Sequence, residues 1–192
     1  MDLLKTMVYL KEPIACHVIR DVVMGVKTLH EEKLIHRDIK PENILISDGV
    51  LKLADFGWSV RSTAKNRRKT YCGTLDYTPP EMLVSKMTGR QNSYDEYVDI
   101  WTVGVFTYEM NVGKAPFEAR SANDTEKRIW HNKFDVPQHF SPELKDFIVR
   151  VLQTDPSKRL TLAQMLEHPW ITGKKLEKSS LFRSITPIMQ FK

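Results

Sequence analysis

Two short polar motifs, and the apolar segments between them, constrain the fold of this chain more than any other feature. The motifs are HRDIKPEN at 36–43 and DFG at 55–57, and between them two apolar runs flank the dipeptide Asp-Gly at 48–49. Asp-Gly between apolar runs is a strong signal for a two-residue β-hairpin turn. Because a tight hairpin brings its two ends together, we expect Asn43 and Asp55 to lie close to each other.

The ends of this predicted hairpin carry the chemistry of a metal site. Asn43 and Asp55 offer amide and carboxylate oxygens, the hard ligands that Mg²⁺ prefers alongside substrate phosphates. The alternative is that each motif is a chance tripeptide, as a lone HRD or DFG usually is. Their order, and the hairpin that joins them, favour the functional interpretation.

Both motifs resemble the protein kinase signature, HRDLxxxN followed by DFG, with Ile39 in place of leucine. The resemblance implies ATP and Mg²⁺ as cofactors, with Asn43 and Asp55 as the metal ligands. It implies that Asp38 accepts the proton of the attacking hydroxyl group, and that Lys40 places positive charge on the γ-phosphate.

Composition limits the remaining classes of function. The chain has 192 residues, 41% of them hydrophobic, which suits one domain with its own core. A net charge of +5 is modestly basic, but no nucleic-acid motif accompanies it, and phosphate-bearing or acidic partners fit as well. Two cysteines, no signal peptide and no apolar run of about 20 residues predict a soluble intracellular protein without disulfides or membrane spans.

The apolar periodicity predicts a fold of class α+β that is mainly α, with short β-hairpins carrying the catalytic and metal-binding loops. Helices are expected from Glu12, over 99–110, from Ser141 and from Thr161. The polar segment 81–97 is expected to be a surface loop, and 173–192 a basic, loosely held tail.

Three polar side chains of the predicted helices need an explanation. Asp99 lies in an apolar segment, so it should be hydrogen-bonded to backbone, with the catalytic loop as the expected partner. His17 and His30 are expected to be surface or packing residues rather than ligands.

The segment after DFG predicts a regulatory site. Five Lys or Arg residues lie between 61 and 69, and Thr70 occupies the place of the phosphosite between DFG and the PPE sequence at 79–81. A phosphate on Thr70 would add negative charge and could order the loop by pairing with Arg37.

Within the kinases, the chain resembles the Aurora family of Ser/Thr kinases from about residue 11 to 172. The motifs that carry this resemblance are DFGWSV at 55–60, RRKT at 67–70, CGTLDY at 72–77, PPE at 79–81 and HPWIT at 168–172. The family suggests a role in mitosis, in the nucleus or on chromosomes or the spindle.

The resemblance assigns roles to further residues. Lys40 and Thr74 resemble the pair that supports the catalytic aspartate, while Glu81 and Arg159 resemble a buried structural ion pair. Asp99 is a further structural residue. The cofactor-binding residues implied are Lys40, Glu42, Asn43, Leu45 beneath the adenine ring, and Asp55.

The same resemblance implies substrates that carry an arginine two residues before the acceptor Ser or Thr. Glu42 and Glu109 match carboxylates that receive this arginine, and Leu75 is the third substrate-binding residue. The alternative is that Glu42 is only a solvated carboxylate. Because Arg68 stands two residues before Thr70, autophosphorylation or phosphorylation by a separate activating kinase is expected.

Residues 1–172 resemble only the C-terminal lobe of a kinase domain, without the Gly-rich loop, the VAIK lysine or the αC helix. We therefore expect this chain alone to be weakly active or inactive, and partners that dock on the small lobe to find no site. The alternative function is a non-catalytic binding module that occupies partners without phosphorylating them.

Overall fold

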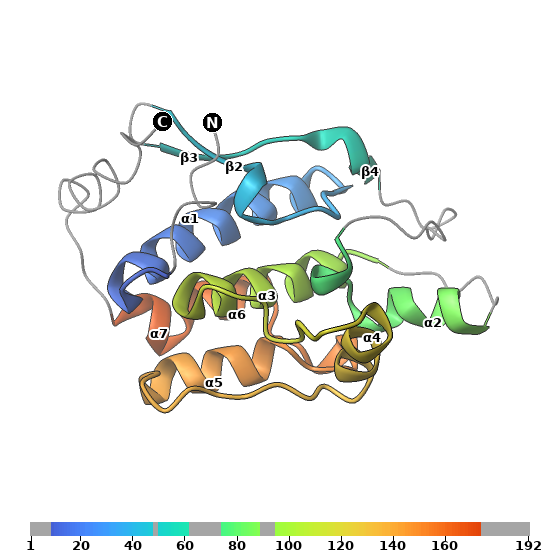
Figure 1. Ribbon diagram of the computed structural model, residues 1–192. Helices are drawn as coiled ribbons and strands as arrows, with labels where there is room; N and C mark the ends of the chain where they lie inside the picture. Colours follow the sequence, from blue (N-terminus) through green and yellow to red (C-terminus); the bar gives the residue numbers. More distant parts are fainter. Residues whose placement is uncertain (1–8, 48–49, 62–73, 89–94, 174–192) are drawn as a thin grey trace, which may run out of the picture.

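The computed structural model describes residues 9–47, 50–61, 74–88 and 95–173 (Figure 1). The α-helices are α1 (Glu12–Glu31), α2 (Pro80–Thr88), α3 (Tyr97–Val112), α4 (Ala122–Trp130), α5 (Pro142–Val151), α6 (Leu162–Glu167) and α7 (Pro169–Thr172). The strands are β1 (Leu34–Ile35), β2 (Ile44–Ser47), β3 (Val50–Leu53) and β4 (Val60–Arg61). Four 3₁₀ turns complete the described elements: η1 (Pro41–Asn43), η2 (Phe56–Trp58), η3 (Leu75–Tyr77) and η4 (Pro156–Lys158). The predicted fold class, mainly helical with short antiparallel hairpins, is confirmed.

Helix α3 is the centre of the hydrophobic core. Trp101 and Phe106 are completely buried, and most of the circumference of the helix is apolar. Figure 1 shows α3 between α1 and α5, and it packs against both. The approach to α5 is close, because a Cβ on Gly104 would meet Val151 Cγ1 at 2.7 Å and Leu152 Cδ2 at 2.8 Å. Any larger side chain at position 104 would push the two helices apart.

The helices begin where the sequence supplies caps. Ser141 accepts a hydrogen bond from the Leu144 backbone at the start of α5, and Thr161 forms a capping box with Gln164 at the start of α6. Glu12, at the start of α1, joins distant parts of the chain: its carboxylate accepts the Ser141 hydroxyl at 2.5 Å and the Trp170 indole N–H at 3.0 Å. These contacts fix the helical body on which the polar motifs rest.

The predicted hairpin forms from β2 and β3, with Ile44 opposite Leu53 and Leu45 opposite Lys52. At its open end the Ala54 N–H donates to the Asn43 carbonyl at 2.8 Å, so Asn43 and Asp55 flank the same end of the ribbon. The predicted turn at 48–49 lies outside the described residues. A second pairing, β1 with β4, aligns Ile35 with Val60 and was not predicted.

The expectation of a loop over 81–97 is wrong for its first part, because residues 80–88 form α2. Met82 and Leu83 of this helix are buried, and Met82 packs with Ile35 and Val98 in a small second core. The helix exists because these distant apolar residues cover it, which its own polar sequence does not reveal. Helix α4 was not predicted either. Residues 89–94, and all of the expected tail beyond Gly173, lie outside the described part.

Candidate active site

The loop that carries Asp38 is held by one buried carboxylate. Asp99, in the first turn of α3, is fully buried and accepts the backbone N–H of His36 at 2.9 Å and of Arg37 at 2.7 Å. This is the contact with the catalytic loop that the sequence predicted for a buried aspartate. A charged acceptor with two backbone donors satisfies the carboxylate and fixes the path of the loop.

The backbone at Arg37 is strained in order to present Asp38. Its φ of 70° lies in the left-handed region, which costs a non-glycine residue on the order of 1–3 kcal/mol. Asp99 stabilises this backbone conformation. The side chain of Arg37 adds a second contact, because its Nε donates a hydrogen bond to the Trp58 carbonyl at 2.6 Å. The strained residue thus ties the first motif to the turn that follows the second.

Asp38 lies at the meeting point of three predicted site residues. Lys40 Nζ lies 2.8 Å from Asp38 Oδ2 and 3.5 Å from Thr74 Oγ1, so the expected Lys40–Thr74 pair is present. Asn43 Nδ2 donates to the Asp38 carbonyl at 2.7 Å and to Asp38 Oδ2 at 2.9 Å. These contacts fix the orientation of a carboxylate that could accept a proton from a hydroxyl group.

Asn43 and Asp55, the proposed metal ligands, carry side-chain oxygens of the type that binds Mg²⁺. Because Asn43 uses its amide nitrogen toward Asp38, its amide oxygen is the atom left for a cation. Asp55 has a left-handed backbone with φ 59°, and its Oδ1 accepts the Gly57 N–H at 3.1 Å. In the described residues, no three or more His, Cys, Asp or Glu side chains cluster to hold a metal. Two oxygen ligands fit Mg²⁺, which is typically completed by phosphates and water.

The two motifs are also joined by His36 and Phe56. The His36 Nε2 lies 3.1 Å from the Ala54 carbonyl, and its ring lies 5.2 Å from the Phe56 ring. Phe56 and Trp58 are 49% and 47% exposed, large fractions for aromatic side chains. Leu45, the residue expected beneath adenine, is partly buried on β2. This side of the molecule therefore presents apolar surface next to the polar site.

A tyrosine of η3 and a carboxylate of α3 form a further polar contact. The Tyr77 hydroxyl donates to Glu109 Oε2 at 2.5 Å. Burial raises the pKa of Glu109 above its ordinary value, and the Tyr77 hydrogen bond opposes this effect. Burial, followed by the charge of Glu109, raises the pKa of Tyr77 well above 10. Glu42 acts on both groups through its charge, and Leu75 is partly buried in the neighbouring η3 turn.

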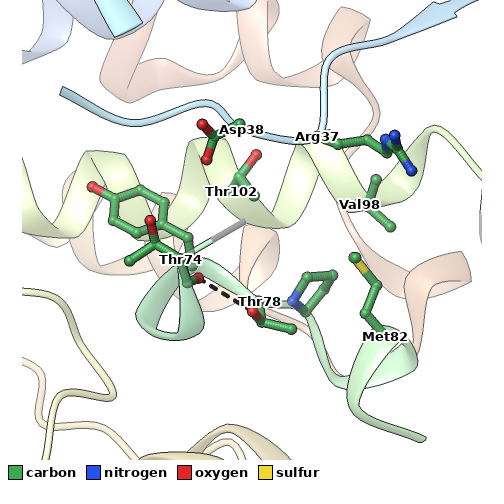
Figure 2. Close-up of a pocket in the computed structure, with 9 residues that line it drawn as sticks. Arg37, Asp38, Thr74, Thr78, Met82, Val98 and Thr102 are labelled. Atoms are coloured by element: carbon green, nitrogen blue, oxygen red, sulfur yellow. Dashed lines mark hydrogen bonds between the residues drawn. The ribbon is translucent and has the colours of Figure 1, made fainter. Parts of the chain in front are cut away.

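A small pocket lies between the loop that carries Asp38 and the segment from Thr74 to Pro79 (Figure 2). Figure 2 shows Asp38 of the loop and Thr102 of α3 facing Thr74 and Thr78. The Thr78 hydroxyl donates a hydrogen bond to the Thr74 carbonyl at 3.2 Å. The residues that line it are Arg37, Asp38, Thr74, Tyr77, Thr78, Pro79, Met82, Val98 and Thr102. The pocket thus joins the catalytic loop to the segment that carries Thr74.

The predicted structural ion pair is present, with the Arg159 side chain fully buried and the Glu81 side chain 17% exposed. Arg159 binds Glu81 through two hydrogen bonds of 2.8 and 2.7 Å, and its guanidinium lies 5.1 Å from the centre of the Trp101 ring. The pair fastens α2, which directly follows the Thr74 segment, to the turn before α6.

His30 is a partly buried residue, and the sequence did not predict its polar contact: its Nε2 lies 2.8 Å from Asp99 Oδ2. His17 is buried and contacts the Pro13 carbonyl, as a packing residue does. No sequence signal marked Tyr77 as the partner of Glu109. Thr70 lies outside the described residues, so its predicted pairing with Arg37 stays a prediction.

The comparisons with known proteins agree with this geometry. The protein kinase domain family matches residues 1–171. The chain is 48% identical over 164 residues to an Aurora kinase of Debaryomyces hansenii, covering 84% of this chain and 38% of that protein. It is 46% identical over 155 residues to Aurora kinase C of Mus musculus (80% of this chain, 54% of that protein), and 50% identical over 143 residues to Aurora kinase A-B of Xenopus laevis (74% and 33%). The chain thus spans between 33% and 54% of these relatives' lengths. Among the described helices, none is long and apolar enough to cross a membrane.

Proposed function

This chain belongs to the protein kinase family, in its Aurora branch, and from that premise we propose that the protein transfers the γ-phosphoryl group of ATP to Ser or Thr hydroxyl groups of other proteins. The observation that carries the proposal is the arrangement around Asp38. Its carboxylate is oriented by Asn43 and Lys40, on a loop whose backbone is fixed by Asp99.

Each residue of this arrangement has a role in the proposed reaction. Asp38 accepts a hydrogen bond from the substrate hydroxyl, aims its oxygen and takes up its proton. Lys40 lies 2.8 Å from Asp38, where a cation can compensate the negative charge of the transferred group. Asn43 and Asp55 would hold Mg²⁺, which would neutralise negative charge on the phosphates of ATP. Leu45 and Glu42 complete the proposed nucleotide contacts.

For the substrate, we propose a preference for arginine two residues before the acceptor. The support is the half-buried Glu109, oriented by the Tyr77 hydroxyl, together with the charge of Glu42. A guanidinium can bind two carboxylates in a planar, bidentate manner that lysine cannot reproduce. Leu75 is the proposed apolar contact for the peptide.

The regulatory and cellular parts of the proposal rest on the Aurora relatives. We propose that phosphorylation of Thr70, by the protein itself or by another kinase, orders the segment around it through Arg37. On the same ground we propose a role in mitosis and chromosome control. We also propose that residues 1–172 are the C-terminal lobe of a kinase domain.

The test is phosphate transfer by the complete protein, purified from its own cells, with labelled ATP and two peptides. One peptide has the sequence Arg-Arg-x-Ser, and the other has alanine in place of the arginine two residues before serine. We expect transfer that needs Mg²⁺, with a kcat/KM at least about tenfold higher for the arginine peptide. A protein that binds the arginine peptide but transfers no phosphate to it would overturn the proposal, in favour of a binding module.

A further inference from the structure

Thr78 makes a polar contact that the proposed reaction does not use. The residue is only 2% exposed, although threonine is mostly a surface residue. Its hydroxyl donates to the Thr74 carbonyl oxygen at 3.2 Å, the bond marked in Figure 2, and the Tyr77 N–H donates to the same oxygen at 3.0 Å. Two donors therefore hold one carbonyl group at the start of the η3 turn.

The residue that is held in this way is the one that reaches the active site. Thr74 is exposed, and its hydroxyl is a partner of Lys40, with Lys40 Nζ 3.5 Å from Thr74 Oγ1. This distance is close to the longest at which a hydrogen bond still forms. A small shift of Thr74 away from Lys40 would therefore end the contact, and Lys40 would lose one of the two groups that orient it beside Asp38.

Thr78 is suited to hold Thr74 because it is itself fixed to the helical body. As a β-branched residue it has few side-chain rotamers, and the two prolines that follow it have a fixed φ. These prolines lead into α2, where Met82 packs in the small second core and Glu81 binds Arg159. A buried, anchored residue thus holds an exposed residue of the same turn.

We propose that Thr78 is a positioning residue of the active site: through the Thr74 carbonyl it keeps the Thr74 hydroxyl against Lys40, and so links α2 to the group that faces Asp38. The proposal rests on the proposed function, in which Lys40 compensates the negative charge of the transferred group. Thr78 is buried and is not one of the proposed nucleotide contacts. Its change should therefore lower kcat and leave the KM for ATP unchanged.

The chain offers a matched control in Thr107. Its hydroxyl also donates to the carbonyl four residues earlier, that of Val103, at 2.7 Å, and the residue is completely buried. Thr107 lies about two turns along α3 from Asp99 and does not line the pocket of Figure 2. A change of Thr107 to Val removes the same type of hydrogen bond from the core, away from Lys40.

The first experiment compares Thr78→Val, Thr78→Ser and Thr107→Val in the complete protein, with kcat and the KM for ATP measured below the melting temperature of each variant. Val keeps the shape of the side chain without its donor, and Ser keeps the hydroxyl. We expect kcat to fall about fivefold in Thr78→Val, the worth of one neutral hydrogen bond, and to recover to within about twofold in Thr78→Ser. Thr107→Val should leave kcat unchanged. Equal kcat values in Thr78→Val and Thr107→Val would overturn the proposal.

A double-mutant cycle tests whether Thr78 acts through Thr74. In a Thr74→Val background the hydroxyl that contacts Lys40 is already absent. If Thr78 acts only by placing this hydroxyl, Thr78→Val should lower kcat no further in that background, so that the two effects are not additive. A second loss of about fivefold in the double variant would show an independent effect of Thr78 and would contradict the proposed role.

NMR relaxation separates this inference from the proposed function. The Leu75 N–H lies in the same peptide plane as the Thr74 carbonyl, so its order parameter reports how firmly that carbonyl is held. We expect the order parameter to fall from about 0.85, the value of a rigid backbone, toward about 0.6 in Thr78→Val, and to stay unchanged in Thr78→Ser and Thr107→Val. If the wild-type protein transfers no phosphate, the proposed function fails, and this measurement alone decides whether Thr78 holds Thr74: a fall supports it, and an unchanged value contradicts it.

Discussion

Arg159–Glu81 and Lys40–Asp38 are ion pairs of nearly equal length, but the cation is buried in the first pair and partly exposed in the second. Arg159 Nη2 lies 2.7 Å from Glu81 Oε2, and Lys40 Nζ lies 2.8 Å from Asp38 Oδ2. The Arg159 side chain has no exposed surface, and its remaining N–H groups donate to carbonyl oxygens, including that of Tyr97. The Lys40 side chain is 23% exposed, and its further partner is the hydroxyl of Thr74 at 3.5 Å.

The difference shows how one type of contact can stabilise the fold in one place and serve chemistry in another. Arg159 is enclosed by acceptors and by the Trp101 ring, so breaking its pair leaves an uncompensated charge in the core. The Lys40 side chain is partly exposed, so an anionic partner can approach it from solvent. A pair that can exchange one partner for a phosphate suits catalysis better than stability.

The largest expected effect on stability follows from the buried pair. Glu81→Ala should lower the free energy of unfolding by about 3–5 kcal/mol, because the guanidinium of Arg159 stays buried without its partner. Urea denaturation measures the loss. A change below about 1 kcal/mol, the value typical of an exposed pair, would remove the contrast between the two ion pairs.

The corresponding change at the active site should affect the rate more than the fold. Lys40→Met should reduce kcat about 100-fold, the cost of removing one preorganised positive group. The loss of stability should be smaller than in Glu81→Ala, because Asn43 still donates a hydrogen bond to the buried Asp38 carboxylate. Transfer to the arginine peptide and urea denaturation are measured on the same preparation. If the variant loses stability as Glu81→Ala does and keeps its kcat, then Lys40 is structural.

The hydrogen bond between Tyr77 and Glu109 predicts a pH dependence of substrate binding. Burial raises the pKa of Glu109 above 4.5, so the KM for the arginine peptide should fall as the pH rises through that pKa and the carboxylate ionises. Tyr77→Phe removes a hydrogen bond that lowers this pKa, so the fall in KM should move to higher pH. The alanine peptide should show no such dependence, and an equal dependence for both peptides would exclude Glu109 as the arginine site.

The smallest effect is expected at an exposed ion pair. Arg150 Nη1 lies 3.5 Å from Asp146 Oδ2, and both side chains are more than half exposed. Arg150→Ala should change the free energy of unfolding by about 0–1 kcal/mol and leave transfer unaffected. A loss of stability as large as that of Glu81→Ala would show that burial does not determine how much these ion pairs stabilise the fold.

The sequence predicted those parts of the fold that depend on residues close together in the chain. The apolar runs beside an Asp-Gly pair predicted the β2–β3 hairpin, and a capping box marked the start of α6 at Thr161. The cost of burying a charge predicted the contact of Asp99 with the catalytic loop. At the candidate site, the flanking of one hairpin end by Asn43 and Asp55 follows from motif spacing, whereas the Lys40–Thr74 contact was implied by the family resemblance.

The parts that the sequence did not predict depend on partners far along the chain. Helix α2 is covered by Ile35 and Val98, and the two-residue strands β1 and β4 exist only through each other. His30 resembles any histidine at the end of a helix until Asp99 is seen beside it. The predicted role of Thr70 remains untested, because it lies outside the described residues.

The most direct test of the central claim compares Asp38→Asn with Asp146→Asn in the complete protein, with labelled ATP, Mg²⁺ and the arginine peptide. Both variants replace a carboxylate by an amide of the same shape, one in the catalytic loop and the other on the outer face of α5. Without a base for the hydroxyl proton, Asp38→Asn should lose about 1000-fold in kcat at an unchanged melting temperature, whereas Asp146→Asn keeps its rate. Equal transfer by the two variants would contradict the assignment of Asp38 as the catalytic residue.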